Sequence, residues 1–266
     1  MRLDSLGYRT DLIFSRFAGE VQARGDYLVI RTPSNPTYYW GNFLIFSHAP
    51  QAGDYTRWLE LFAQEIGIPP TVNHVALGWN NAVGEQGDYA PFFADGFVLE
   101  ESVVLTARQV VFPPKYNSAI EARILTTDEE WEQATQSQIE CREAEHSLES
   151  YTVFKRAQMA SYRAMARQGI GQWFGAFVDG EFAGDLGVFV ENGVGRFQAV
   201  GTKPEFQRRG VCSTLVYEAA QYALKSLGAN VLVMVADANY HAAQIYESVG
   251  FHPAERQTGL QRTQKR

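Results

Sequence analysis

The residues best suited to chemistry form the basic segment Gln207-Arg208-Arg209-Gly210, between an expected strand and the start of an expected helix. The first N–H groups of a helix have no partner within it, and the helix dipole is positive at that end, so phosphate oxygens bind there readily. Gly210 lets the backbone approach a ligand without a Cβ clash, while Arg208 or Arg209 can add a charge-assisted contact. The segment therefore predicts a site for a phosphate-bearing anion.

The same segment lacks the two common nucleotide-binding motifs. No Gly-Lys-Ser/Thr follows Gly210, so the segment is not a Walker loop, and the three glycines of the dinucleotide fingerprint are missing. We therefore expect neither nucleotide hydrolysis nor hydride transfer.

The elements that must position this loop begin with three apolar segments, residues 173–178, 182–190 and 196–200. They are separated by Asp179-Gly180 and Asn192-Gly193. These dipeptides tolerate the positive φ angles of tight hairpin turns, which predicts a three-stranded antiparallel meander.

The elements after the loop alternate helix and strand. Apolar residues recur at three- and four-residue spacing over residues 212–227, which predicts an amphipathic helix. The valine-rich residues 231–236 are typical of a strand buried on both faces. A short helix over about residues 241–249 follows, with Asp237 or Asn239 as its cap.

Two helices are expected upstream of the meander, over residues 128–142 and 150–168, the first opened by Thr127 or Asp128. Residues 128–149 contain eight carboxylates and a single basic residue. The simpler interpretation is a solvated helical face, and the alternative is an acidic rim that attracts a cationic amine.

The N-terminal part of the chain repeats the same order more weakly. Its expected elements are strands over residues 27–31, 38–46 and 72–79 and a helix over residues 56–66. A Gly-Phe pair follows an apolar pair at Gly96, as it does at Gly250, which favours an internal duplication. The proline pair at 113–114 is the natural linker, giving domains 1–114 and 115–266.

Two motifs carry a resemblance to a known family. Gln207-Arg208-Arg209-Gly210-Val211-Cys212 resembles the Gln/Arg-x-x-Gly-x-Gly/Ala pyrophosphate loop of the GCN5-related N-acetyltransferase (GNAT) superfamily, with Cys212 as a mild departure. Residues 239–251 are similar to its Asn-x-x-Ala-x-x-Leu-Tyr-x-x-x-Gly-Phe segment. The resemblance covers roughly residues 120–260, and the whole chain looks like a tandem member whose N-terminal half is degenerate. It implies an α/β (α+β) fold with a mixed, mainly antiparallel sheet flanked by helices.

The resemblance also implies roles for individual residues toward acetyl-CoA. The pyrophosphate would be held by the backbone of Gln207, Arg208, Arg209, Gly210, Val211, Cys212 and Ser213. The pantetheine arm would pair, like an added strand, with the main chain of Ala199, Val200, Gly201 and Thr202. Asn239 would hydrogen-bond CoA, unless it is a plain helix cap.

Tyr246 would lie near the thioester sulfur and protonate the leaving thiolate, whose pKa of about 8.5 suits a phenol donor. The alternative is an aromatic residue that fills the inner face of its helix. An alkylammonium must lose its proton before it attacks, and the candidate bases are Gln198 through water, Asp185, Glu181 and His241. His241 could equally be a surface residue. A backbone N–H near Val200 would stabilise the oxyanion.

The N-terminal half has no counterpart of the basic loop. Residues 47–54 occupy that place, with Pro50 removing one donor and Asp54 where phosphates would lie, so we expect no CoA binding there. Its aromatic residues are expected to form a core and an interface with the catalytic half, or less readily one wall of the acceptor cleft. They are Tyr38, Tyr39, Trp40, Trp58 and Trp79.

Composition excludes several classes of protein. The chain of 266 residues is 45% hydrophobic and carries a net charge of −7, which is typical of a globular protein and weighs against nucleic-acid or anionic-membrane binding. No signal peptide and no run of about 18 apolar residues occurs, so we expect a cytoplasmic protein. Cys141 and Cys212 support neither a disulfide framework nor a cysteine metal site.

The sequence thus favours an acetyl-CoA-dependent N-acetyltransferase. It would transfer the acetyl group to a primary amine of a small molecule or a protein, by direct attack in a ternary complex. The alternative from another class is a non-catalytic acyl-CoA sensor or regulatory module, and a purely structural scaffold is the weakest hypothesis. The sequence leaves the acceptor open, and it leaves the oligomeric state open between monomer and homodimer.

Overall fold

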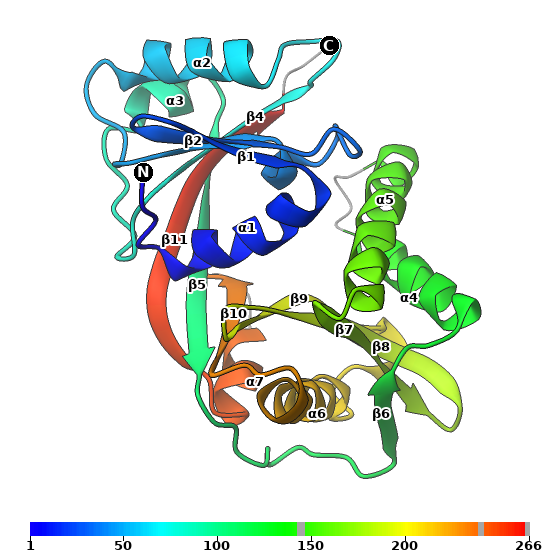
Figure 1. The fold of residues 1–266 in the computed structure, drawn as a ribbon. Helices are drawn as coiled ribbons and strands as arrows, with labels where there is room; N and C mark the ends of the chain where they lie inside the picture. Colours follow the sequence, from blue (N-terminus) through cyan, green and yellow to red (C-terminus); the bar gives the residue numbers. More distant parts are fainter. Residues whose placement is uncertain (143–146, 239–241, 264–266) are drawn as a thin grey trace. The chain divides into compact units, whose positions relative to one another are not determined.

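The structure is a computed structural model that describes residues 1–142, 147–238 and 242–263 (Figure 1). The chain forms two compact units. The first consists of Met1–Val104 and Glu255–Arg266, and the second of Leu105–Ala254. Strands β5 (Val98–Ala107) and β11 (His252–Thr263) contribute residues to both units. The units therefore divide ten residues before the expected linker, and the end of the chain packs with the N-terminal unit.

The Leu105–Ala254 unit contains most of the elements expected around the basic loop. In chain order they are β6 (Ile120–Ile124), α4 (Asp128–Glu140), α5 (Leu148–Arg167), β7 (Gly171–Val178), β8 (Glu181–Glu191), β9 (Val194–Thr202), α6 (Val211–Ser226), β10 (Val231–Asp237) and α7 (Ala242–Ser248). The strand order is β5-β10-β9-β8-β7-β6. Helices α4 and α5 cover one face of this sheet, and α6 covers the other (Figure 1).

Local sequence explains why these elements form where they do. The first turn residues, Asp179 and Asn192, both have φ 51°, and the glycines that follow them are also left-handed, which confirms the predicted hairpins. Helix α4 begins with a capping box, in which Thr127 Oγ1 accepts from the Glu130 N–H and Glu130 Oε2 accepts from the Thr127 N–H. Both hairpins and this helix bring Gln138, Asp185 and β9 into one unit.

The Met1–Val104 unit repeats the order of the second half of the chain. Its elements are α1 (Leu6–Ala18), β1 (Glu20–Arg24), β2 (Tyr27–Arg31), β3 (Phe43–Phe46), α2 (Asp54–Glu65), β4 (His74–Trp79), α3 (Ala90–Ala94) and β5, and β11 joins them. The strand order is β1-β2-β3-β4-β11-β5. A strand-strand-strand-helix-strand-helix-strand order therefore occurs twice in the chain.

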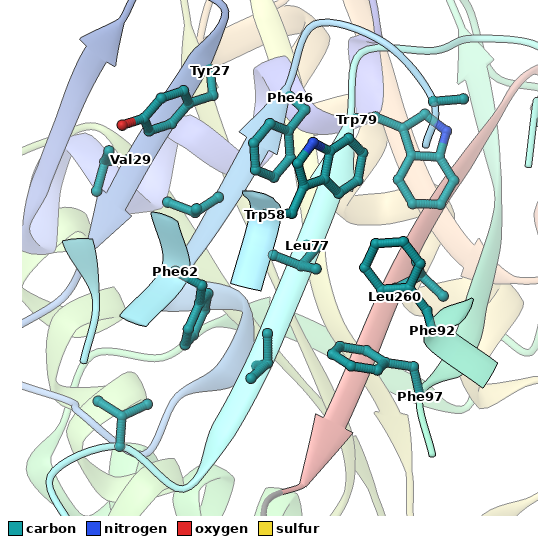
Figure 2. Close-up of a cluster of buried hydrophobic side chains, with 14 residues drawn as sticks. Tyr27, Val29, Phe46, Trp58, Phe62, Leu77, Trp79, Phe92, Phe97 and Leu260 are labelled. Carbon is teal, nitrogen blue, oxygen red and sulfur yellow. The ribbon is translucent and has the colours of Figure 1, made fainter. Parts of the chain in front are cut away.

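Alternating side chains of β2, β3 and β4 point to opposite faces of this sheet, and both faces are buried. Val29, Phe46 and Leu77 lie in the cluster beneath α2 and α3 that Figure 2 shows. Their neighbours along the strands, such as Ile30 and Ile45, lie in a second cluster on the α1 side. A central strand buried on both faces needs a continuous apolar run, which these strands have.

The expected strand over residues 38–46 is wrong in its first half. A 3-10 turn spans Tyr39–Gly41, and the strand begins only at Phe43. Asn42 stabilises the turn because its Nδ2 donates to the carbonyls of Asn35 and Tyr38. The apolar pattern could not reveal this competing set of hydrogen bonds.

The fold class is confirmed as mixed α/β. The strand pairs are mainly antiparallel, with a parallel pair at β3–β4 and another at β9–β10. Among residues 1–142, 147–238 and 242–263, no helix has both the length and the apolarity that a bilayer crossing requires.

Candidate active site

Strand β9 departs from regular pairing at the residues expected to hold the pantetheine arm. Gln198 pairs with Gly187 of β8 and Gly201 pairs with Asp185, so β9 carries one extra residue between these pairs. Ala199 lies in this bulge with φ 51°, a left-handed conformation that is unfavourable for alanine. Ala199, Val200, Gly201 and Thr202 are all half-buried. A bulge bends its strand, so the main chain after Ala199 runs in a different direction from the main chain before it.

The parallel pair of β9 and β10 ends before either strand does. The pairing runs from Val194–Val231 to Arg196–Val233, and in the described residues no later pair joins the two strands. Strand β9 nevertheless continues to Thr202 and β10 to Asp237. Residues 197–202 of β9 therefore have a main-chain edge that β10 does not use, and an extended ligand could pair with it.

The basic loop leads into α6 as the sequence predicted. Gly210 is the N-cap with φ 82°, and Arg208 has φ 60°. No side chain in the described part of the chain caps the helix, and its first turn contains no acidic residue. Gln207, Arg208 and Arg209 are exposed. A helix start with free N–H groups and exposed cations fits a diphosphate.

The segment around the expected linker braces this loop. Asn117 Nδ2 donates to the Arg209 carbonyl at 3.0 Å, and the Asn117 N–H donates to Thr214 Oγ1 at 2.9 Å. A Cβ on Gly210 would lie 2.3 Å from the Lys115 carbonyl oxygen, so the glycine is required by this contact. The sequence had predicted instead that the missing side chain serves the approach of a ligand.

The side chains of the three residues after Gly210 offer little to a ligand. The Ser213 hydroxyl donates to the carbonyl oxygens of Lys115 and Gly210, which leaves only its backbone N–H for a ligand. Val211 is buried. Burial raises the pKa of the Cys212 thiol to about 12, so this cysteine stays protonated and is a poor nucleophile.

Tyr246 lies on α7, a short helix that packs against α6 and β10. Its side chain is buried, as expected for an aromatic residue on the inner face of the helix. Asn239 and His241, named as a CoA ligand and as a candidate base, lie outside the described residues.

The remaining candidate bases occupy different environments. Glu181 is exposed beside the hairpin turn, and Gln198 is half-buried on β9 directly before the bulge. Asp185 is completely buried, and burial raises the pKa of its carboxyl group to about 7, although hydrogen bonds from Trp173 and Gln138 oppose the shift. A buried carboxyl group cannot contact an amine directly from this position.

A buried polar cluster around Asp185 was missed by the sequence argument. Gln138 Nε2 donates to Asp185 Oδ2 at 3.1 Å and to the Ala199 carbonyl at 2.8 Å. Trp173 Nε1 donates to the same Asp185 oxygen at 2.9 Å. One signal existed, because Gln138 lies seven residues after Trp131 and therefore on the apolar face of the expected helix.

Lys155 on α5 interacts electrostatically with this cluster. Burial lowers the pKa of its ammonium group to about 8, while Asp185 and Cys141 oppose the shift. Its Nζ donates to Gln158 Oε1 at 2.8 Å and lies 5.1 Å from the centre of the Phe154 ring. The chain thus buries a cation and a carboxyl group within one unit.

Three acidic residues of α4 have basic partners. Asp128 pairs with Arg163, Glu130 with Arg123, and Glu132 with Arg156. These pairs favour the interpretation of a solvated helical face over that of an acidic rim.

A pocket of about 340 Å³ lies elsewhere in the unit, between β6, β7 and α6. Its lining includes Arg123, Glu218, Tyr222 and Lys225. None of the predicted site residues that the structure describes lines it.

Comparison with known proteins identifies the family of this unit. A family profile described as the acetyltransferase (GNAT) family matches residues 131–251, which lie within the Leu105–Ala254 unit. No curated protein matches the chain.

Solved structures resemble the whole chain. A functionally unknown conserved protein from Staphylococcus epidermidis has a TM-score of 0.73 at 12% identity, over 93% of this chain and 95% of that one. A GCN5-related N-acetyltransferase from Kribbella flavida has a TM-score of 0.68 at 13% identity, over 97% and 96%. A tandem GNAT protein from the clavulanic acid biosynthesis pathway has a TM-score of 0.56 at 16% identity, over 95% and 87%. At such low identities, the structural similarity shows a shared fold alone. The family match over residues 131–251 identifies this part of the chain as a member of the GCN5-related N-acetyltransferase (GNAT) superfamily.

Proposed function

We propose that the protein is an acetyl-CoA-dependent N-acetyltransferase that acts on a primary amine of a small molecule or a protein. Its family carries out acyl-CoA-dependent acetyl transfer in general. The observation that carries the proposal is the main-chain edge of residues 197–202 that β10 does not pair with, in the same unit as the uncapped, basic start of α6. The first fits an extended amide-containing arm, and the second fits a diphosphate.

In this proposal the backbone from Gln207 to Ser213 binds the CoA pyrophosphate. Arg208 and Arg209 add charge-assisted contacts, and Arg209 is already oriented because its guanidinium carbon lies 5.2 Å from the centre of the Phe206 ring. The main chain from Ala199 to Thr202 pairs with the pantetheine arm. Asn239 adds a hydrogen bond to CoA. Bound acetyl-CoA supplies the activated acyl group.

Proton transfer is assigned to two residues. Tyr246 protonates the departing thiolate, and Gln198 positions a water that takes the proton from the attacking amine. Gln198 suits this role because it is half-buried beside the bulge, whereas Asp185 is enclosed and Glu181 lies at the hairpin turn. The amine must be neutral to attack, so activity should rise with pH until the amine or Tyr246 limits it.

The first test is direct binding of CoA by calorimetry, and the second is release of free thiol from acetyl-CoA in the presence of amines and peptides. We expect CoA binding and amine-dependent thiol release. Absence of CoA binding by the wild-type protein would refute the proposal. Binding without thiol release across a broad set of acceptors would favour the acyl-CoA sensor instead.

Tyr246→Phe tests the acid. We expect kcat to fall about 100-fold or more with little change in the KM for acetyl-CoA, because general acid catalysis typically contributes that much. Tyr217→Phe is the matched control, since Tyr217 lies on α6 and its hydroxyl accepts a hydrogen bond from Gln221 Nε2. A Tyr246→Phe variant with full activity would remove the assignment.

We also propose that the chain is a tandem member of the family with a degenerate N-terminal half that does not bind CoA. The repeated element order supports this proposal. Calorimetry should therefore give one CoA per chain, and a stoichiometry of two would contradict it.

A further inference from the structure

The Ala199 bulge is held from the side by Gln138. The Gln138 amide nitrogen donates to the Ala199 carbonyl oxygen at 2.8 Å, from a helix 61 residues earlier in the chain. Ala199 has φ 51°, which alanine adopts only at a cost in free energy. A specific hydrogen bond to its carbonyl oxygen compensates for part of that cost, so the bulge depends on this contact.

Asp185 fixes the orientation of the Gln138 amide. The same nitrogen donates to Asp185 Oδ2 at 3.1 Å, so it faces two acceptors at once. A flipped amide would place its oxygen against a carboxyl group and a carbonyl oxygen, and neither can donate when Asp185 is ionised. Trp173 Nε1 donates to the same Asp185 oxygen at 2.9 Å and holds the carboxyl group in place.

The cluster also explains Gly201. A Cβ at this position would lie 3.1 Å from Gln138 Nε2 and 3.5 Å from Asp185 Oδ1. The main chain on both sides of Val200 therefore packs directly on the polar cluster. The cluster is in a position to set the direction of the main chain over the whole bulge.

We propose that Gln138 and Asp185 are positioning residues that hold the β9 bulge so that its main chain can pair with the arm of an acyl-CoA. The inference rests on the proposed function. Neither side chain contacts the thioester in this scheme, because both are buried and act through Ala199.

The test separates the arm from the rest of the cofactor. Two probes are used in calorimetry, CoA and adenosine 3′-phosphate 5′-diphosphate, which is CoA without its pantetheine arm. For Gln138→Met we expect the Kd for CoA to rise about 10-fold, as for the loss of one useful hydrogen bond, while the Kd for the armless nucleotide stays within about 2-fold. Gln136→Met is the control, because Gln136 lies on the exposed face of the same helix and should leave both values unchanged.

Substitutions of Asp185 distinguish positioning from general support of the fold. Asp185→Asn keeps an acceptor for Gln138 and Trp173, so CoA affinity should stay within about 2-fold of wild type. The double variant Gln138→Met/Asp185→Asn replaces the carboxyl group by a neutral amide that can still accept from Trp173, so it avoids a buried charge without Gln138 and should fold even if Gln138→Met does not. It should still bind CoA about 10-fold more weakly than wild type and bind the armless nucleotide normally.

Two outcomes would overturn the inference while leaving the proposed function intact. One is wild-type CoA affinity in both Gln138 variants. The other is an equal loss of CoA and armless nucleotide, which would indicate general damage to the unit. Failure of the wild-type protein to bind CoA is a different result, because it would refute the proposed function itself and this inference with it.

Discussion

The two strand-helix-strand segments β3-α2-β4 and β9-α6-β10 share an order of elements but differ where a ligand would bind. In β3-α2-β4 the parallel pairing continues to the last residue of both strands, Phe46 with Trp79. In β9-α6-β10 it ends at Arg196 with Val233, and both strands continue. The first pair of strands therefore stays joined to its end, whereas the second pair separates and leaves residues 197–202 without β10 as a neighbour.

The N-terminal ends of α2 and α6 also differ in whether an anion could bind there. Helix α2 has Asp54 in its first turn, and this carboxylate accepts a hydrogen bond from the Gln51 N–H and occupies the place of an anion. The Pro50 carbonyl before it accepts from the Asp88 N–H, so another loop covers the approach. Helix α6 begins with no acidic residue, directly after two exposed arginines.

Side chains fill the corresponding region of the N-terminal unit. The rings of Phe46 and Trp58 are stacked with centres 3.8 Å apart, and Trp79 and Phe92 pack beside them (Figure 2). The comparison teaches that the same topology can end in a filled core in one unit and in two separating strands in the other. The choice depends on a few positions at the ends of two strands.

The largest expected effect concerns the aromatic cluster of the segment β3-α2-β4. Trp58→Ala should lower the free energy of unfolding by about 3–5 kcal/mol, because a completely buried indole is removed from a stacked cluster. Urea denaturation measures the loss. Trp58→Phe should cost less, partly because the indole N–H finds no acceptor in the part of the chain that the structure describes. A loss below about 1 kcal/mol for the alanine variant would show that this cluster is not a core.

The next effect concerns the middle strand of each three-stranded segment, β2 and β8. Strand β8 buries the carboxyl group of Asp185, whereas the buried residues of β2 are apolar. The raised pKa means that the native state keeps a proton which the unfolded chain releases, so stability falls as pH rises from about 4 to about 7. Asp185→Asn removes this penalty. It should raise the free energy of unfolding at pH 8 by up to about 4 kcal/mol, and by much less near pH 4.

Urea denaturation at both pH values tests this prediction. Equal effects of Asp185→Asn at pH 8 and pH 4 would mean that the carboxyl group does not titrate with a raised pKa in the folded protein.

A smaller effect is expected at the helix starts. Arg208→Ala/Arg209→Ala should raise the Kd for CoA about 10-fold to 100-fold by removing charge-assisted contacts to phosphate. The loss should shrink at high salt because exposed charges are screened. Arg57→Ala on α2 is the matched change in the other unit and should leave CoA affinity unchanged. Weaker CoA binding in the Arg57 variant would contradict the assignment of binding to one unit.

The smallest effect concerns α4, which carries Gln138 and has the side-chain cap that α2 lacks. Thr127→Ala should lower the free energy of unfolding by about 1 kcal/mol, measured by thermal denaturation. Thr126→Ala is the control, because it keeps the backbone N–H bond to Glu130 Oε2 at 2.7 Å and removes only a long hydroxyl bond of 3.4 Å to the same atom. Equal losses in the two variants would indicate that the cap contributes little.

Local sequence by itself determined the elements around the site. Asp179-Gly180 and Asn192-Gly193 specify their turns through φ angles that few residues tolerate, and the spacing of apolar residues specifies α6. The basic loop before α6 was predictable for the same reason, since its chemistry depends on adjacent residues. The first half of the predicted strand over residues 38–46 failed because side-chain hydrogen bonds of Asn42 outweighed a weak apolar pattern.

Three features were decided only by the tertiary structure. They are the residue at which the pairing of β9 and β10 ends, the side chain that stabilises the β9 bulge, and the contact that requires a glycine at position 210. Each depends on groups far apart in the chain, such as Gln138 with Ala199, or Lys115 with Gly210. The packing of β11 with β4 likewise joins the end of the chain to the N-terminal unit. Such contacts follow from the geometry of packed elements, and the periodicity and turn preferences of a sequence report only on neighbours within a few residues.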